Sequence, residues 1–239
     1  MIPRLKIVIL CMVLGAFTAG YAHAQTYIFV TPSGSSTSGG PVDASATFTV
    51  GTGTLDITLT NLESNPKDVA QSLSDLEFTL STGQTSGTLA SSSGDPVDIT
   101  STSTASTPGT AVSTGWGLNN NVKGGLQLDA LGYSGPAYTI IGPGVGAGSD
   151  VYSNANSSIV NVPHNPFIWE TGTFVLDIPG ITTSTVVTSA TFSFGTTAGT
   201  DDVPGGGQTP EPATMLLFGS GLLALGGFLR RRKGTAIAA

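Results

Sequence analysis

Two neighbouring runs of this chain, residues 42–50 and 55–60, alternate between apolar and polar side chains at a period of two. That period places every second side chain on the same face of a β-strand, so each run predicts a strand with one face in a core. The intervening Gly51-Thr-Gly53 is short and carries two glycines, which is typical of a hairpin turn. This predicted hairpin is the strongest local constraint on the fold. Its apolar members are Ala44, Ala46, Phe48, Val50, Leu55, Ile57 and Leu59.

The rest of the body, residues 25–200, repeats this pattern in short segments separated by turn residues, and it is rich in Gly, Ser, Thr and β-branched side chains. We therefore predict an all-β fold, an antiparallel β-sandwich with Greek-key connections of the Ig-like or jelly-roll-like kind. Residues 81–114 are more than half Ser and Thr, and we expect a solvated, partly mobile insertion with edge strands such as 85–90. A short helical turn is expected near 67–73. The other predicted strands are 27–30, 76–80, 116–118, 126–131, 167–169, 172–178 and 185–194, the last with a bulge.

Charge is distributed very unevenly along the chain. Six of the eight basic residues lie near the two ends, so residues 25–209 hold two lysines against fourteen acidic residues, a formal charge of −12. A body with so few cations cannot neutralise phosphates, which excludes nucleic acid as a partner. Acidic polysaccharides bound through salt bridges are disfavoured for the same reason. Neutral glycans and divalent cations remain as potential partners.

The body also lacks most reactive side-chain types. Cys11 is the only cysteine and lies within the first 24 residues, so the body has no disulfide, no thiolate ligand and no cysteine nucleophile. His164 is the only histidine after residue 24, and it stands in a proline-bounded turn. The sequence also contains no G-x-S-x-G motif, which would mark a nucleophilic serine. We predict that the protein is not an enzyme and has no catalytic residue. A glycoside hydrolase that uses two carboxylates is the remaining enzymatic alternative, because carboxylate separations of about 5–10 Å cannot be obtained from the sequence.

Aromatic side chains are the first candidates for ligand contacts. The indole rings of Trp116 and Trp169 have the shape and polarity to stack on the apolar faces of sugar rings, as in carbohydrate-binding modules. Packing in the core is the competing interpretation for both tryptophans. The tyrosines that share this interpretation are Tyr133, Tyr138 and Tyr152.

Acidic side chains are the second candidates, because Ca²⁺ prefers six to eight oxygen ligands and is common outside cells. Asp95 and Asp98 share one predicted loop, and Asp201 and Asp202 are adjacent. Neither pair matches an EF-hand or a nonapeptide repeat, so we predict no metal site and no cofactor, with Ca²⁺ as the alternative left open. Solvated acids that keep the protein soluble explain these residues better.

The first 24 residues have the three parts of a secretory signal peptide. Arg4 and Lys6 form a positive start, residues 7–17 form an apolar segment, and Ala22 and Ala24 bracket a small-x-small cleavage site. The apolar segment is shorter than the roughly 20 residues that a membrane-spanning helix needs. We predict a signal helix that is removed after Ala24.

Near the C-terminus, the apolar run 215–229 is followed directly by four basic residues. As a helix its 15 residues would extend roughly 23 Å, slightly less than a hydrocarbon core of about 30 Å. We predict a C-terminal transmembrane helix that holds the body outside the inner membrane, since basic residues after such a run remain in the cytoplasm. A flexible, glycine-rich spacer is expected at 201–208 and a short tail at 234–239. The predicted membrane stop consists of Arg230, Arg231, Arg232 and Lys233.

Pro210, Glu211 and Pro212 stand between the spacer and the apolar run. Both prolines lack an amide proton and fix φ, which keeps this segment extended and accessible to a protease just outside the bilayer. Residues 209–233 taken together resemble the PEP-CTERM sorting signal of Gram-negative bacteria, although Thr209 stands where Val is common. The resemblance implies recognition by exosortase, a membrane-embedded cysteine protease-transpeptidase. It also implies transient anchoring in the inner membrane and, for many such proteins, a link to extracellular polysaccharide or biofilm matrix.

These observations lead to one main hypothesis and two alternatives. The main hypothesis is an exported, non-enzymatic protein that is sorted through its C-terminus to the cell surface or an extracellular, exopolysaccharide-associated matrix. The first alternative is a carbohydrate-binding module tethered to the surface, and the second is the carboxylate-dependent glycoside hydrolase.

Overall fold

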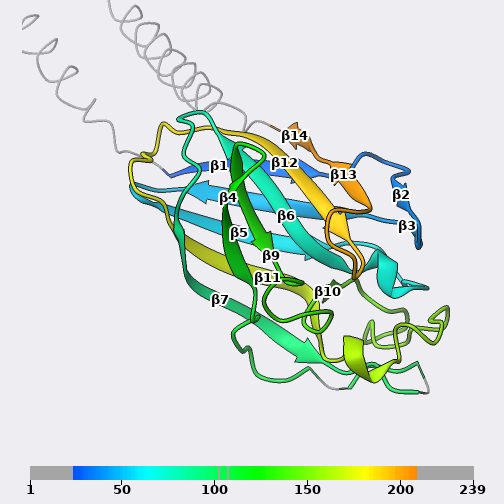
Figure 1. The fold of residues 1–239 in the computed structure, drawn as a ribbon. Coiled ribbons are helices and arrows are strands. Elements are labelled where there is room, and N and C mark those ends of the chain that lie inside the picture. The colour runs from blue at the N-terminus through cyan, green and yellow to red at the C-terminus, as the bar shows by residue number, and fades with distance from the viewer. Residues whose placement is uncertain (1–23, 102, 107, 209–239) are drawn as a thin grey trace, which may run out of the picture.

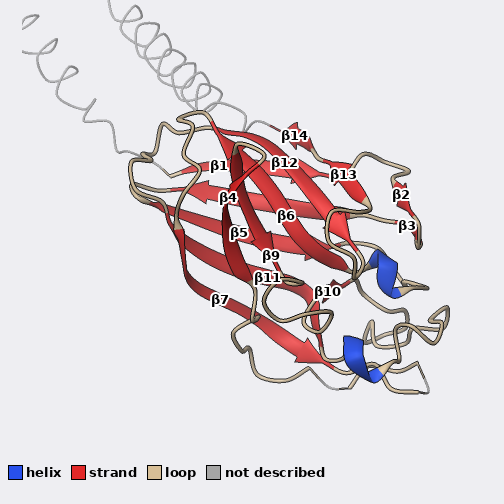
Figure 2. Ribbon diagram, viewed as in Figure 1, coloured by secondary structure: helices blue, strands red, loops and turns tan. Residues whose placement is uncertain are grey.

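The computed structural model describes residues 24–101, 103–106 and 108–208. Within them the chain is built from β-strands, with two single turns of 3₁₀ helix (Figure 2). The all-β prediction is therefore confirmed. The predicted signal helix and the predicted C-terminal transmembrane helix lie outside the described residues.

The predicted hairpin is present as β4 (Ala44–Val50) and β5 (Thr54–Asn61). The strands are antiparallel, with Phe48 opposite Ile57, so that the apolar sets of both strands share one face. Alternate residues of β4 and β5 are buried as the sequence pattern predicts. Gly53 has a φ of 77° in the connecting turn, a conformation that glycine adopts without steric cost.

The first sheet extends this hairpin on both sides in the order β14-β1-β4-β5-β11-β7. Strand β7 forms one edge of this sheet and lies inside the Ser/Thr-rich segment, where an edge strand was expected. Thr88 begins this strand, three residues later than predicted. The added strands are β1 (Gln25–Val30), β7 (Thr88–Val97), β11 (Phe167–Asp177) and β14 (Gly206–Gln208).

The second sheet has the order β13-β12-β6-β9-β8. Figure 1 shows β6, β9 and β12 crossing over β4, β5 and β11, so that the two sheets form two layers. The predicted irregularity in β12 is confirmed, because the register with β6 shifts between Val187 and Ser189 and again between Ser193 and Phe194. The strands are β6 (Leu73–Leu80), β8 (Gly117–Val122), β9 (Gly125–Asp129), β12 (Val187–Phe194) and β13 (Asp202–Pro204).

Two short connections join the sheets. At one side β10 (Ile140–Ile141) pairs parallel with β11 and antiparallel with Leu73 of β6, so that hydrogen bonding continues from one layer to the other and twelve strands of the described chain form a single folded-over sheet. This is the one parallel pairing among the strands that the structure describes. At the opposite side the chain passes through Gly205 from β13 of the second sheet to β14 of the first. The two layers are therefore linked at both sides of a common core.

The core lies between the inner faces of the two sheets. Phe48 of the first sheet and Phe78 of the second have ring centroids 5.4 Å apart, and both side chains are almost fully buried. Burial of large aromatic and aliphatic side chains is the main stabilising contribution in such a layered fold. The central residues of this core are Phe29, Leu55, Leu59, Leu76, Leu126, Leu128, Phe174, Leu176, Ala190 and Phe192.

A second, smaller apolar cluster lies beneath the long connections at one end of the sheets. Tyr152 and Ile159 from the loops pack there with Phe167 of β11, and Val69 belongs to the same cluster. Both 3₁₀ turns are at this end, η1 (Val69–Gln71) and η2 (Val162–His164) (Figure 2). The helical turn expected near 67–73 is η1. A separate two-stranded ribbon consists of β2 (Ser36–Thr37) and β3 (Gly40–Pro41).

The segment 201–208 corrects a prediction. Its glycines and acids indicated a flexible spacer, but residues 202–204 form β13 on β12 and residues 206–208 form β14 on β1. The glycines serve close packing, because a Cβ at Gly205 would lie 2.9 Å from the Phe192 ring and one at Gly207 would lie 2.9 Å from the Phe29 ring. The segment is therefore part of the folded body.

Candidate functional site

The C-terminal end of the described chain is held against the N-terminal strand. Strand β14 pairs antiparallel with β1, and Gln208 is opposite Ile28. Strand β1 begins at Gln25, one residue after the predicted signal-peptide cleavage site at Ala24. The two predicted membrane-directed segments therefore adjoin neighbouring strands of one sheet edge.

Asp201 and Asp202 fix the chain just before this edge, and they do so with different partners. The Ser38 amide and hydroxyl both donate to the Asp201 carboxylate, at 3.0 and 2.6 Å. Asp202 accepts a hydrogen bond of 2.6 Å from the Ser193 hydroxyl and lies 3.5 Å from the Lys123 ammonium. Each acid thus has a structural partner.

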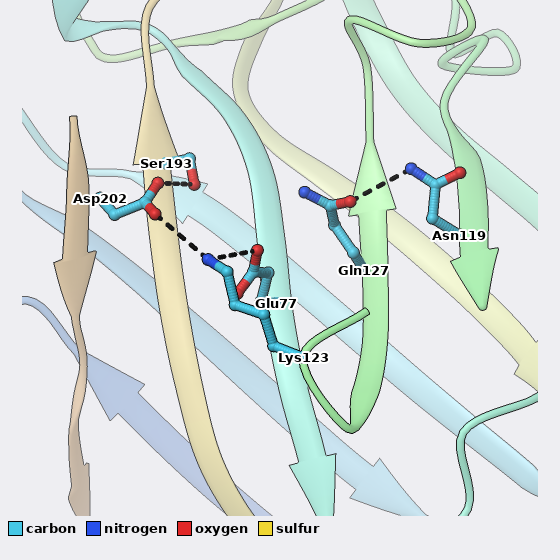
Figure 3. Close-up of polar contacts among 6 residues, drawn as sticks. All are labelled: Glu77, Asn119, Lys123, Gln127, Ser193 and Asp202. Carbon is cyan, nitrogen blue, oxygen red and sulfur yellow. Dashed lines mark hydrogen bonds and ion pairs between the residues drawn. The ribbon is translucent and has the colours of Figure 1, made fainter. Parts of the chain in front are cut away.

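Lys123 occupies the outer face of the second sheet. From the turn between β8 and β9 its ammonium reaches 2.9 Å to Glu77 of β6 and 3.5 Å to Asp202 of β13 (Figure 3). These two carboxylates raise the pKa of Lys123, with the hydrogen bond to Glu77 as the largest cause. One cation therefore connects three neighbouring parts of this sheet, and it is one of only two lysines in the body.

A row of polar side chains crosses the same face. Asp129, Asp75, Ser193 and Asp202 are successive Cα partners on β9, β6, β12 and β13, and we call them the acid row. Cross-strand partners project from the same face of a sheet, so three carboxyl groups share one row. Asn119 supports the row from β8, because its amide donates to Asp129 at 2.9 Å. The same amide donates to Gln127 at 3.1 Å (Figure 3).

Asp75 is the most perturbed member of the acid row. Its side chain is 1% exposed, and its Oδ1 atom has no hydrogen-bond partner in the described part of the chain. The pKa of the Asp75 carboxyl is raised to about 6, with burial as the largest cause and the nearby Asp129 and Asp202 carboxylates acting in the same direction. The Ser193 and Gln127 side chains offset part of this effect. A carboxyl group with so little exposure is not accessible to a polymeric substrate.

Trp116 does not lie where a ligand can stack on it. The side chain is 4% exposed, its ring centroid lies 5.2 Å from that of Phe174, and its Nε1 donates to the Tyr138 carbonyl at 2.8 Å. The proposal that Trp116 forms a ligand platform is therefore wrong, and core packing explains this residue. An apolar ring with one satisfied N–H is the usual form of a buried tryptophan.

Trp169 lies at a bulge in β11 and lines a groove. The register with β7 jumps from Ile168 opposite Pro96 to Gly172 opposite Gly94, so three residues of β11 face Asp95 alone. Glu170 within this bulge has a φ of 60°, an uncommon conformation for a side chain of this kind. The groove has a volume of about 420 Å³ and is lined by Ser93, Gly94, Asp95, Ala111, Trp169, Glu170, Thr171 and Thr173.

The remaining candidates have structural roles. The Nδ1–H of His164 donates to the Ser158 carbonyl at 2.6 Å, which suits a residue that closes a turn. Tyr152 is fully buried and donates to the Gly142 carbonyl at 2.9 Å, and burial is the main cause that raises its pKa. Tyr138 is half-buried against the core, while Tyr133 is exposed at the surface of β8.

Asp95 and Asp98 are the other acidic pair that the sequence offers as ligands for Ca²⁺. Both side chains are exposed, and the groove that Asp95 lines does not include Asp98. In the ranges that the structure describes, no three His, Cys, Asp or Glu side chains gather in a way that could hold a metal ion.

The sorting and membrane residues of the sequence analysis lie outside the described ranges, apart from Ala24, which is exposed. They are Ala22, Pro210, Glu211, Pro212, Arg230, Arg231, Arg232 and Lys233. No helix within the described ranges is long and apolar enough to cross a membrane.

Comparison with known proteins identifies one feature. A family model described as the PEP-CTERM protein-sorting motif matches residues 208–233. No curated protein and no solved structure matches the chain. The predicted sorting signal is thereby confirmed, and it implies export, transient membrane anchoring through the C-terminus and processing by exosortase. The motif begins at Gln208, the last residue of β14, so it adjoins a paired strand.

The sequence predicts the sorting motif but not the two strands, β13 and β14, that lead into it. The pairing of β14 with β1 and the acid row both depend on the register of strands far apart in the chain. The β-branched Val203 directly after two acids was the available signal for β13, and the glycines of β14 gave none.

Proposed function

We propose that this protein is an exported, non-enzymatic β-sandwich that exosortase processes at its C-terminus and that then resides at the cell surface or in an extracellular, exopolysaccharide-associated matrix. The observation that carries the proposal is the sorting motif at residues 208–233, which continues directly from the folded body. A body with formal charge −12 and without cysteine also suits long exposure outside the cell.

The non-enzymatic part of the proposal rests on how the reactive side chains are used. His164 is engaged with a backbone carbonyl, and the carboxyl group with the most perturbed environment, Asp75, is shielded from solvent. Asp201 and Asp202 connect the C-terminal segment to the body. His164, Asp201 and Asp202 therefore have structural partners and Asp75 is shielded, so none of the four is placed to attack a substrate.

Intact-mass analysis of the protein from its native host tests the sorting part. The expected mature chain begins at Gln25 and ends before Met215. A matched variant with Pro210→Ala and Pro212→Ala keeps the apolar run and the basic cluster, and we expect it to accumulate as the unprocessed form. Retention of residues 215–233 in the mature wild-type protein would count against exosortase processing.

A second candidate function, binding of a neutral glycan, is favoured by the groove at Trp169. An indole and two carboxylates line it, and no basic side chain does. Aromatic faces stack on pyranose rings while carboxylates accept hydrogen bonds from hydroxyl groups, so this lining suits an uncharged sugar. Titration of the body with neutral oligosaccharides should give saturable binding that Trp169→Ala removes. Sustained glycan turnover that a single Asp→Asn change abolishes would instead indicate an enzyme.

A further inference from the structure

The last strand before the sorting motif is weakly attached to the body. Strand β14 consists of two glycines and Gln208, and its pairing partner is β1, through three Cα pairs at one edge of the first sheet. Gly206 and Gly207 bring no side chain to the core. A strand of this length, held mainly by backbone pairing at an edge, belongs to the part of a fold that opens most readily.

The preceding strand is attached in a different way. Asp202 of β13 is held by Ser193 at 2.6 Å and Lys123 at 3.5 Å, and Asp201 is held by two hydrogen bonds from Ser38. Side-chain contacts thus hold residues 201 and 202, and backbone pairing with β12 of the second sheet continues to residue 204. The attachment changes at Gly205, where the chain crosses to the first sheet.

This arrangement leaves no free spacer between the body and the motif, which begins at Gln208. Peptidases commonly bind substrate segments as extended strands through backbone hydrogen bonds. Strand β14 already has its backbone paired with β1 along one side. A membrane-embedded peptidase that engages the start of the motif therefore competes with β1 for the same segment.

We infer that β14 is a release strand, which leaves β1 when the processing peptidase binds the chain, while β13 remains attached and limits the opening. Release of three residues at about 3.3 Å each supplies roughly 10 Å of extended chain between the body and the motif. This inference rests on the proposed processing by exosortase. It adds that the folded body controls access to the sorting signal.

A disulfide between β14 and β1 tests the inference. Ile28 and Gln208 are Cα partners, and the mature body contains no cysteine, so Ile28→Cys with Gln208→Cys introduces the only thiol pair. Processing is followed in the native host by pulse-chase and intact mass. We expect the oxidised double variant to be processed at least about tenfold more slowly than wild type, because a covalent link holds the strand in place. Addition of a reductant should restore the rate.

Two controls separate the possible outcomes. The single variant Gln208→Cys changes the same motif position without a link, and Thr47→Cys with Thr58→Cys places a comparable disulfide between β4 and β5. The Thr47–Thr58 variant should be processed like wild type, and the Gln208→Cys single variant sets the reference rate against which the linked variant is compared. If the linked Ile28–Gln208 variant is also processed at the wild-type rate, β14 does not need to leave β1 and the inference is wrong. If wild type itself is not processed, the proposed function has failed instead.

A pair of glycine substitutions tests whether loosening β14, rather than locking it, changes the rate of processing. A Cβ at Gly207 would lie 2.9 Å from the Phe29 ring, whereas one at Gly206 would meet its nearest atom at 3.8 Å. Gly207→Ala should loosen β14 and speed processing by about twofold or more, while Gly206→Ala should be no faster than wild type. Equal rates for the two variants would contradict a role for the β14–β1 pairing.

Discussion

Asp75 of β6 and Asp129 of β9 are direct cross-strand partners on the outer face of the second sheet, and their side chains are only 1% and 8% exposed. The environments of the two carboxyl groups differ. Asp129 accepts hydrogen bonds from Asn119 at 2.9 Å and from the Gly132 amide at 3.1 Å, whereas Asp75 Oδ1 has no such partner among the described residues. The charge at Asp75 therefore costs the fold stability, because burial disfavours an ionised carboxylate and the Ser193 and Gln127 side chains offset only part of that cost.

Asp75→Asn should stabilise the protein at neutral pH. The pKa of the carboxyl is 3.8 in the reference state and about 6 in the fold, so the folded state binds more protons between these values and wild-type stability falls as pH rises from about 4 to 6. A difference of about two pKa units corresponds to roughly 3 kcal/mol. Urea unfolding at pH 4 and pH 7.5 should show no gain for Asp75→Asn at the lower pH and the full gain at the higher one.

The control for this measurement is Asp56→Asn on the exposed side of β5, which should show no comparable gain at either pH. A gain for Asp75→Asn that grows as the pH falls would contradict the assigned environment, since it would require a carboxylate that the fold stabilises.

Lys123→Met should reduce stability only slightly and in a salt-dependent way. The Lys123 side chain is 65% exposed, so its pairs with Glu77 and Asp202 are screened by water and ions. We expect a loss below about 1 kcal/mol in the free energy of unfolding at low salt, and a smaller loss at 1 M salt. Lys67→Met is the matched control, because Lys67 forms no ion pair within the described ranges.

The sequence predicts those strands that are long enough to show a repeating pattern of buried and exposed side chains. The hairpin of β4 and β5 follows from Phe48, Ile57 and their neighbours, because one buried face imposes a period of two on the side chains. Strand β10 has two residues, Ile140 and Ile141, which is too short for any period to appear. It exists because β6 and β11 offer pairing partners there.

The candidate sites also depend on strand register, which the sequence does not give. Asp75 and Asp202 are far apart in the chain and meet only through the registers of β6, β12 and β13. Trp169 was a candidate from its residue type alone, and the same reasoning chose Trp116, which the fold places in the core. Residue type therefore suggests which side chains can bind a sugar, while the bulge in β11 decides which one lines a groove.

The two tryptophans should respond differently to substitution. Trp116→Ala removes a buried ring that packs on Phe174 and should lower the free energy of unfolding by about 3–5 kcal/mol. Trp116→Phe keeps most of the packing but leaves the Tyr138 carbonyl without its donor, with an expected loss of roughly 1–3 kcal/mol. Trp169→Ala should cost less stability than Trp116→Ala, since Trp169 is only half-buried. Equal losses measured by urea unfolding would argue against the groove.

The final prediction concerns Asn61, whose side chain connects the two sheets next to β10. It is fully buried, and its amide donates to the carbonyls of Gln71 and Ile140, each at 2.9 Å, while its Oδ1 accepts from the Glu63 amide at 3.1 Å. Asn61→Leu would remove this hydrogen-bond partner from all three backbone groups, two of them in buried contacts and the third part-buried. Because a buried unpaired polar group costs about 1–3 kcal/mol, the variant should lose at least about 3 kcal/mol of unfolding free energy.

Asn120→Leu is the matched control, since Asn120 also bonds to backbone groups but is exposed at β8. Its unfolding free energy should change by less than about 1 kcal/mol, because water replaces the lost partner. Hydrogen exchange at Ile140 and Ile141 adds a local readout. Faster exchange there in Asn61→Leu, with β4 and β5 still protected, would show that the joint between the sheets opens before the core does. Unchanged exchange at both isoleucines would mean that β10 is held by its strand pairing alone.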